Sequence, residues 1–191
     1  IDADLGCNPV VSQVPHWSPV PGTPLYDRLE KEGRILHQIP LEEWHAFRQP
    51  WFVHPSFTLV EAEKVQNRAY TRDFFELGPS TLRFIAVELE GWRNLRDSSS
   101  PHLRQRARAV AAGAWKLQSI ALAIRHLAPT DHIRDLADEV LAGMARDFGP
   151  PWLPQQGIAA GLYLSGRARQ WRTAFFGDAL QPPTRMVKYN Q

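Results

Sequence analysis

The spacing of apolar residues after residue 58 constrains the fold of this chain more than any other feature of the sequence. Apolar side chains recur there every three or four positions, which is the period of an α-helix with one buried face. Small residues occur often on these faces and allow two helices to pack closely. Consecutive helices joined by short loops predict an antiparallel bundle. The clearest segment, residues 101–127, carries Leu103, Ala107, Val110, Ala114, Leu117, Ala121 and Ile124.

Capping and breaking residues predict where these helices end. Thr58 and Glu61 have the spacing of a capping box, in which each residue satisfies a backbone group of the other. Ser56 is the alternative cap to Thr58, and Thr130 or Asp131 is expected to cap a later helix. The residues expected to end helices are Gly78, Pro129 and Gly149-Pro-Pro151. The segments expected to be helical are therefore 41–47, 58–77, 80–96, 101–127, 131–148 and 156–176.

The first forty residues have a different character. The chain begins with Ile1, and residues 1–6 have the pattern of a helix end with Gly6 as the C-cap. Val10–Val14 is a short β-branched segment that predicts a strand. A single strand needs neighbours for its backbone, and the rest of the sequence offers none, so we expect a piece cut from a longer polypeptide. A turn at Pro21-Gly22 then precedes a short helix at 25–31, which Thr23 caps and Gly33 ends.

We therefore expect a mainly α protein, a bundle of four to five helices that follows a short N-terminal strand. Hydrophobic residues make up 43% of the chain and charged residues 22%, which argues against disorder. No apolar run is long enough to span a membrane. The single cysteine, Cys7, cannot form an internal disulfide and favours a cytoplasmic setting.

No catalytic set stands out in the sequence. The seven histidines are scattered and include no HExxH pair, and there is no phosphate-binding glycine loop or GxSxG elbow. His16 and His54 are the best placed, because they lie in proline-rich loops where functional residues concentrate. The net charge of +2 does not imply nucleic acid binding by itself. Two local clusters of arginine are the features that could bind phosphate groups or nucleic acid. They are Arg104, Arg106 and Arg108, and then Arg167, Arg169 and Arg172 beside Trp171.

One segment carries a family resemblance. Ser18-Pro-Val-Pro-Gly-Thr-Pro-Leu-Tyr26, followed by Asp27-Arg-Leu-Glu-Lys-Glu-Gly33, resembles the end of the partial barrel of radical S-adenosylmethionine enzymes. The similarity is to the class that also carries a cobalamin-binding domain. Further features of the resemblance are Trp44, Val53-His-Pro55, Ala69-Tyr70, Gly78-Pro-Ser80, Arg83 and Gln181-Pro-Pro-Thr-Arg185.

The resemblance implies a division of the chain. Residues 1–40 would be the end of the barrel, with its last strand, the turn and a short helix. Residues 41–176 would form a C-terminal helical domain that packs on the barrel and helps to close its active site, and residues 177–191 an extended tail. The resemblance also implies that the turn lies near S-adenosylmethionine at the barrel mouth, although a purely structural turn explains it equally well. The residues concerned are Trp17, Ser18, Pro19, Pro21, Gly22 and Thr23.

The same resemblance limits what this chain does alone. Family members hold a [4Fe–4S] cluster through a CxxxCxxC motif, which this sequence lacks and which Cys7 does not match. We therefore expect no catalytic residue, no metal ligand and no cofactor in this chain. The parent polypeptide would supply the cluster, the S-adenosylmethionine site and, where it is used, cobalamin, and the rest of that polypeptide is the expected partner.

Two other interpretations remain open. The chain is either a fragment of such an enzyme or a stand-alone helical module for protein interaction, in which case the resemblance is coincidental. Nucleic acid binding through the arginine clusters is a third and weaker interpretation. Tryptophans in loop-like segments are expected at an interface, namely Trp44, Trp51 and Trp152. The substrate and the reaction of the parent enzyme are not readable from the sequence.

Overall fold

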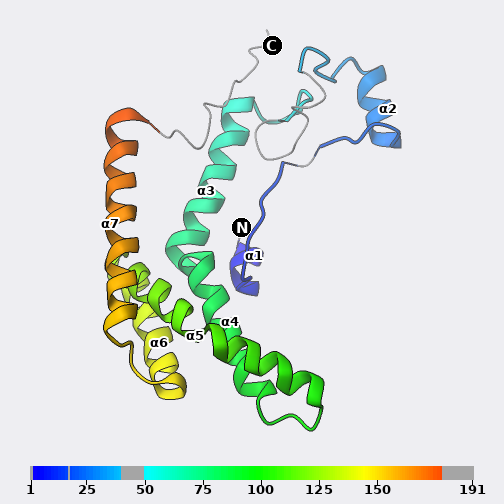
Figure 1. Cartoon of the computed structure of the whole chain (residues 1–191). Helices are drawn as coiled ribbons and strands as arrows, with labels where there is room; N and C mark the ends of the chain where they lie inside the picture. Colours follow the sequence, from blue (N-terminus) through cyan, green and yellow to red (C-terminus); the bar gives the residue numbers. More distant parts are fainter. Residues whose placement is uncertain (1, 17, 40–49, 178–191) are drawn as a thin grey trace. The chain divides into compact units, whose positions relative to one another are not determined.

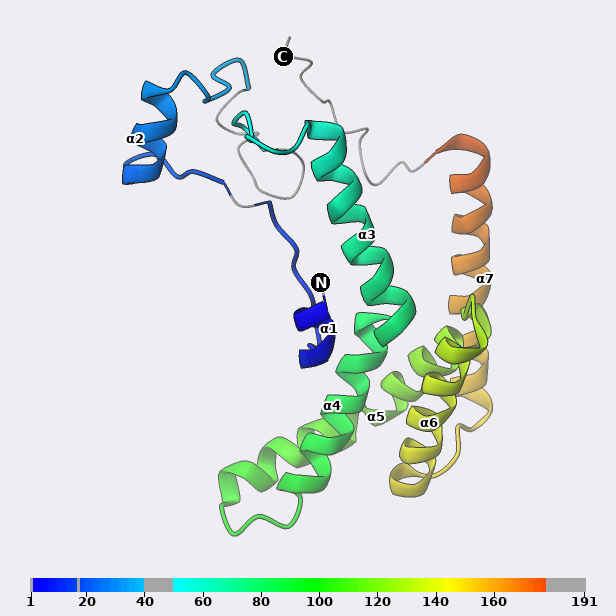
Figure 2. The same cartoon turned by 180° about the vertical axis from the view of Figure 1, so that it is seen from behind.

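The computed structural model describes residues 2–16, 18–39 and 50–177 (Figures 1 and 2). These residues are mainly helical and divide into two compact units. The first unit comprises residues 2–12 and 73–177, and the second comprises the described residues between 13 and 72. Seven helices occur in the described residues: α1 (Asp2–Cys7), α2 (Pro24–Lys31), α3 (Leu59–Leu77), α4 (Ser80–Leu95), α5 (Pro101–Leu127), α6 (Asp131–Phe148) and α7 (Leu153–Phe176).

Helix α5 is the centre of the first unit. It packs against α4, α6 and α7, and α4 also packs against α6. Alanines occupy the contacts that α5 makes, so that neighbouring backbones approach closely, as the sequence predicts. The core between α4, α5 and α6 is formed by Leu82, Ile85, Leu89, Ala114, Ala121, Ala137, Leu141 and Met144. The predicted helical bundle is therefore confirmed.

Two buried glutamines join α5 to α7. Gln155 Nε2 donates to Gln118 Oε1 at 2.7 Å, and Gln118 Nε2 donates to the carbonyl of Gly149 at 2.7 Å. Gln155 Oε1 accepts the backbone N–H of Trp152 at 2.9 Å, which also caps the start of α7. Both amides are thus paired, as buried polar groups must be if burial is not to cost stability.

Most predicted helix ends are correct, because the capping chemistry forms as expected. Thr58 N donates to Glu61 Oε2 at 2.8 Å and Glu61 N donates to Thr58 Oγ1 at 3.3 Å, which completes the capping box. Thr130, rather than Asp131, caps α6 through Ile133 N. Gly78 follows α3 with φ +78°, a value that favours glycine.

Two predicted ends are wrong. Gly6 lies within α1, and Asn8 ends the helix instead with φ +44°, a conformation that asparagine tolerates better than most residues. Helix α7 begins at Leu153 and not at residue 156, because Pro154 lies in its first turn, where no backbone N–H is needed. The predicted helix at 41–47 and the tail from residue 178 lie outside the described residues.

Val10–Val14 does not form the predicted strand. The backbone of this segment is bonded by side chains: Arg83 Nε donates to Val10 O at 3.2 Å, and Gln66 Nε2 donates to Val14 O at 2.7 Å. Val14 N donates to the Tyr70 hydroxyl at 3.2 Å. Val10–Val14 forms no strand because a strand requires a second strand beside it, and the described residues provide none.

The second unit is built around a short pairing of two extended segments. Ile35 and Phe52 form an antiparallel bridge, with Leu36 N donating to Trp51 O and Val53 N to Arg34 O, both at 2.8 Å. Ile35 and Phe52 are buried with Leu29 of α2. On the neighbouring side the buried residues are Leu36, Ile39 and Trp51. Trp51 is only 5% exposed, so the expectation of an interface tryptophan there is wrong.

Candidate functional site

The turn that carries the family resemblance is held at both ends. Pro19 is fully buried, and its carbonyl accepts the indole N–H of Trp51 at 3.1 Å. At the other end Thr23 N and Thr23 Oγ1 both donate to Val20 O, at 3.1 and 2.7 Å. Thr23 Oγ1 accepts Tyr26 N and so caps α2, as the sequence predicts. The turn is therefore a fixed element of the second unit.

The tip of this turn is exposed. Pro21 and Gly22 lie on the surface, and Gly22 has φ +83°, which a side chain with a Cβ rarely adopts. Ser18 Oγ donates to His16 O at 3.2 Å. Of the six residues that the resemblance implies, Pro19 and Thr23 thus support the turn, Pro21 and Gly22 form its exposed tip, and Trp17 lies outside the described residues.

The two histidines singled out from the sequence line one small cavity of the second unit. It measures about 210 Å³ and is lined by Val14, Pro15, His16, Pro50, Phe52, His54, Phe57, Ala62, Val65 and Gln66. The ring of His54 lies 5.9 Å from that of Phe52 and 5.0 Å from that of Phe57. Sequence reasoning places both histidines in proline-rich loops, but it gives no reason for them to lie in the same pocket.

The two imidazoles differ in their hydrogen bonds. His54 Nδ1 accepts the backbone N–H of Ser56 at 3.1 Å, so in the neutral ring the proton is on Nε2. His16 Nε2 is buried and has no hydrogen-bond partner among the described residues. Burial lowers the pKa of His16, and the negative charge of Glu63 offsets part of that effect. His16 therefore favours the neutral form, which can donate or accept one hydrogen bond.

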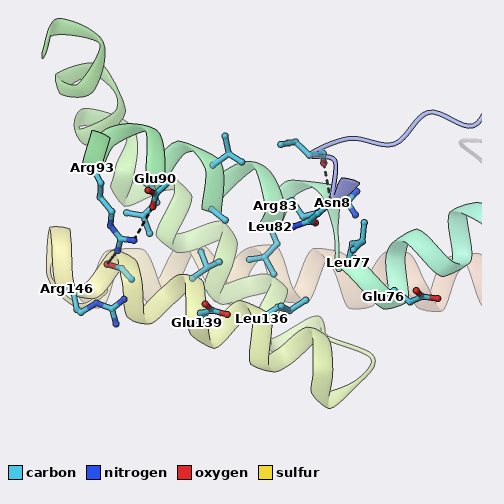
Figure 3. A pocket seen from close by; sticks show the side chains of 16 residues that line it. Asn8, Glu76, Leu77, Leu82, Arg83, Glu90, Arg93, Leu136, Glu139 and Arg146 are labelled. Carbon is cyan, nitrogen blue, oxygen red and sulfur yellow. Dashed lines mark hydrogen bonds and ion pairs between the residues drawn. The ribbon is translucent and has the colours of Figure 1, made fainter. Parts of the chain in front are cut away.

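A larger groove lies in the first unit, along α4 and α6 (Figure 3). Its volume is about 470 Å³, and its floor is apolar. Charged side chains line its edges, as Figure 3 shows for Arg93, Arg146 and Glu139. Arg93 is already paired, because its Nε donates to Asp147 Oδ2 at 2.7 Å. The floor consists of Leu77, Leu82, Ala86, Leu89, Leu136 and Val140.

Arg83, which lines this groove, belongs to a buried ion pair. Arg83, only 8% exposed, donates from Nη1 and Nη2 to the two carboxylate oxygens of Asp73, both at 3.0 Å. Its Nε holds Val10 O, and Ser12 Oγ donates to Asp73 Oδ1 at 2.5 Å. Burial tends to raise the pKa of Asp73, but the hydrogen bonds and charge of Arg83 together with Ser12 outweigh burial and lower it. Sequence reasoning names Arg83 only as part of the resemblance and misses Asp73.

The described residues hold no group of three histidine, cysteine or carboxylate side chains that could bind a metal ion. No helix in the described ranges is long and apolar enough to cross a membrane. Of the arginine clusters, Arg104 has a structural role, since its Nη1 donates to the carbonyls of Ser98 and Ser99.

Comparison with known proteins adds no relative. A scan against models of protein families found no match, and searches of curated proteins and of solved structures found none either.

Proposed function

We propose that this chain is the C-terminal region of a cobalamin-type radical S-adenosylmethionine enzyme, an oxidoreductase or methyltransferase of the cytoplasm. In this proposal residues 1–40 complete the barrel, and the helices after them pack on it and close the active site. The chain is not catalytic alone, and its partner is the remainder of the same polypeptide. The resemblance of Ser18–Tyr26 to the family is the starting point of the proposal.

The anchored turn is the structural observation that carries it. A backbone segment that approaches a ligand must be rigid and must expose its polar groups, and both conditions hold at Pro21 and Gly22. The bonds of Trp51 and Thr23 fix the turn on either side of that tip. The glycine itself does not separate a ligand-binding turn from a purely structural one, because a Pro-Gly turn closed by the bond from Thr23 N to Val20 O favours φ near +80° in either case.

The valine-rich segment before the turn supports the same proposal. Val11 is 62% exposed, although its β-branched neighbours are typical of a buried strand. Pairing with a strand supplied by the rest of the polypeptide would cover Val11. This explains why the segment has a strand sequence but forms no strand here.

The cofactors of such an enzyme do not fit this chain. A [4Fe–4S] cluster requires several cysteine thiolates, whereas Cys7 is the single cysteine and is exposed. The cluster and the cobalamin would be held by other parts of the polypeptide. In the proposal this chain contributes the exposed backbone groups of the turn, which lie near the ligand, and helices that cover the barrel mouth and exclude water from it.

The test uses the natural full-length polypeptide, purified without oxygen. Gly22→Val should distort the exposed tip, because a β-branched residue is strained at φ +83°. Gly33→Val is the matched control, since Gly33 has φ +67° and also has open space around it. We expect Gly22→Val to weaken S-adenosylmethionine binding at least tenfold while iron content is unchanged, and Gly33→Val to weaken it less than threefold. Equal binding by both variants would refute the role of the turn.

A stand-alone interaction module is the second candidate, and one observation favours it. The last turns of α7 expose Trp171 and Phe175 at 66% and 78%. Exposed aromatic residues at one end of a helix are typical of a protein interface. The two candidates differ in what precedes Ile1 in the natural reading frame, because an independent module needs no CxxxCxxC motif upstream.

A further inference from the structure

Helix α7 has two apolar faces, and the bundle covers only one of them. The covered face meets α5: Gln155 bonds to Gln118, and the Tyr163 ring lies 6.2 Å from the ring of His126. Gly166 is packed so closely on α5 that a Cβ there would lie 2.8 Å from Leu127 Cδ1. This face therefore accounts for how α7 joins the first unit.

The other face is a continuous apolar stripe, which we call the outer stripe. Its members are spaced alternately by four and three positions, which is the spacing of a helix-to-helix seam. All of them are exposed, with Leu164 at 65%, Trp171 at 66% and Phe175 at 78%. None is charged. The outer stripe consists of Gly157, Gly161, Leu164, Ala168, Trp171 and Phe175.

The sizes of these side chains make the outer stripe complementary to itself. When two copies of α7 run antiparallel about a centre at residue 166, Gly157 of each chain faces Phe175 of the other. In the same register Gly161 faces Trp171, and Leu164 faces Ala168. Every layer then pairs a small residue with a large one, so that each bulky side chain enters a hollow above glycine or alanine.

We infer that the outer stripe is the contact between two copies of this chain, which form an antiparallel two-fold dimer through α7. The dimer is closed, because each copy uses its own outer stripe and no stripe remains free to bind a third copy. The inference is independent of the proposed function, since it uses α7 alone. It adds an assembly state that the resemblance to a barrel enzyme does not imply.

The available area sets the strength expected of this dimer. The aromatic residues carry about 150–250 Å² each, so the two copies of Trp171 and Phe175 offer roughly 400–700 Å² at their observed exposure. The rest of the stripe brings the interface to about 1,000 Å², at the low end for specific protein complexes. We therefore expect a weak dimer, with a dissociation constant on the order of micromolar or above.

The charges beside the outer stripe provide a way to tell a second copy of this chain from an acidic partner protein, through the effect of salt on binding. Residues 153–176 contain Arg167, Arg169 and Arg172 but no aspartate or glutamate. Two copies of α7 therefore repel each other, and added salt should strengthen their association by screening. An acidic partner protein would instead be attracted, and added salt would weaken its binding.

The test is the molar mass of the 191-residue chain by sedimentation equilibrium from 1 to 200 µM, in Cys7→Ser to exclude adventitious disulfides. Gly161→Trp places two tryptophans in one layer, and Trp171→Gly leaves that layer empty. Each should raise the dissociation constant at least tenfold. The double variant Gly161→Trp/Trp171→Gly should restore it to within about threefold of the parent chain, and so should an equimolar mixture of the two single variants. These expectations follow from the layer in which residue 161 meets residue 171.

Two controls on α7 separate a loss of association from a loss of folding. A Cβ at Gly161 would have no neighbouring atom within 4 Å, so a tryptophan there should leave the circular dichroism unchanged. Phe176→Ala removes an aromatic residue that is 85% exposed but lies off the outer stripe, and it should leave the dissociation constant within threefold. Equal weakening by Phe176→Ala would overturn the assignment of the stripe.

The register is tested by disulfide trapping in the same Cys7→Ser background. Leu164→Cys mixed with Ala168→Cys should give the mixed dimer faster than either variant forms its own dimer, because residue 164 faces residue 168. Faster formation of the two like dimers would overturn the antiparallel register. A chain that stays monomeric at 200 µM, with or without added salt, would overturn the dimer itself and assign the stripe to a different occupant.

Discussion

Substitution of the buried ion pair between Arg83 and Asp73 should lower the stability of the first unit strongly. Their side chains are 8% and 13% exposed, and Arg83 holds both carboxylate oxygens of Asp73 as well as the carbonyl of Val10. Arg83→Met keeps much of the length of the side chain but leaves the carboxylate buried without its cation. Breaking one partner of a buried pair costs about 3–5 kcal/mol.

Urea unfolding followed by circular dichroism at 222 nm measures this cost. With a urea dependence of about 2 kcal/mol per molar, a loss of about 4 kcal/mol lowers the midpoint by about 2 M. The matched control is Arg125→Met, because Arg125 and Asp138 are 37% and 47% exposed and an exposed pair contributes about 0–1 kcal/mol. Equal midpoint shifts for the two variants would refute the assignment of a buried, stabilising clamp.

The pH dependence of this loss provides a second check. The pKa of Asp73 is lowered in the folded chain, so its contribution is fully present above the pKa of the unfolded state, about 4. The contribution is lost as the pH falls through the folded pKa. Without Arg83, only the hydrogen bond from Ser12 opposes the effect of burial, which favours the protonated form of Asp73. The difference in unfolding free energy between wild type and Arg83→Met should therefore shrink between pH 7 and pH 3, and a constant difference would contradict the account.

Three further changes test packing, capping and the histidine cavity. Gly143→Ala should destabilise the first unit by about 1–3 kcal/mol in urea unfolding, because its Cβ would lie 2.8 Å from Leu89 Cδ2, whereas Gly113→Ala, with open space, should stabilise it by about 0.4–1 kcal/mol. Thr130→Ala should cost about 1 kcal/mol by the same assay, since Thr130 caps α6, while Ser100→Ala should change little because Ser100 makes no side-chain cap bond. His16 should titrate below 6.5 in proton NMR, so that folding stability falls as the pH drops through 6.5 toward the folded pKa, and His16→Gln should remove that dependence; a midpoint at or above 6.5 would contradict burial of the ring.

The helices are predictable from the sequence because their information is local. The capping box at Thr58 and Glu61 and the left-handed glycine after α3 form within a few residues, and both appear in the structure as expected. The bundle follows from the apolar period of 101–127. The start of α7 differs from the prediction because Pro154 lies inside the helix, in a first turn where proline is favoured, and does not precede it as a break.

Properties that depend on distant residues are not predictable in this way. Trp51 lies in a segment rich in prolines and aromatics and resembles an interface residue, but its partner, the Pro19 carbonyl, is 32 positions away. The ten-residue separation of Asp73 and Arg83 carries no recognisable pattern, because the two lie on different helices. The strand predicted at Val10–Val14 does not form within the described residues for a related reason: β-branched residues show that a segment can pair, but the partner must come from elsewhere.

The reading frame upstream of Ile1 in the natural gene tests the central proposal most directly. The proposal predicts that this frame continues for several hundred residues and encodes a CxxxCxxC motif, and that the protein purified without oxygen contains about four iron atoms per chain, as one [4Fe–4S] cluster requires. A frame that starts within a few residues of Ile1, or a longer one that lacks the motif and binds no iron, would contradict it.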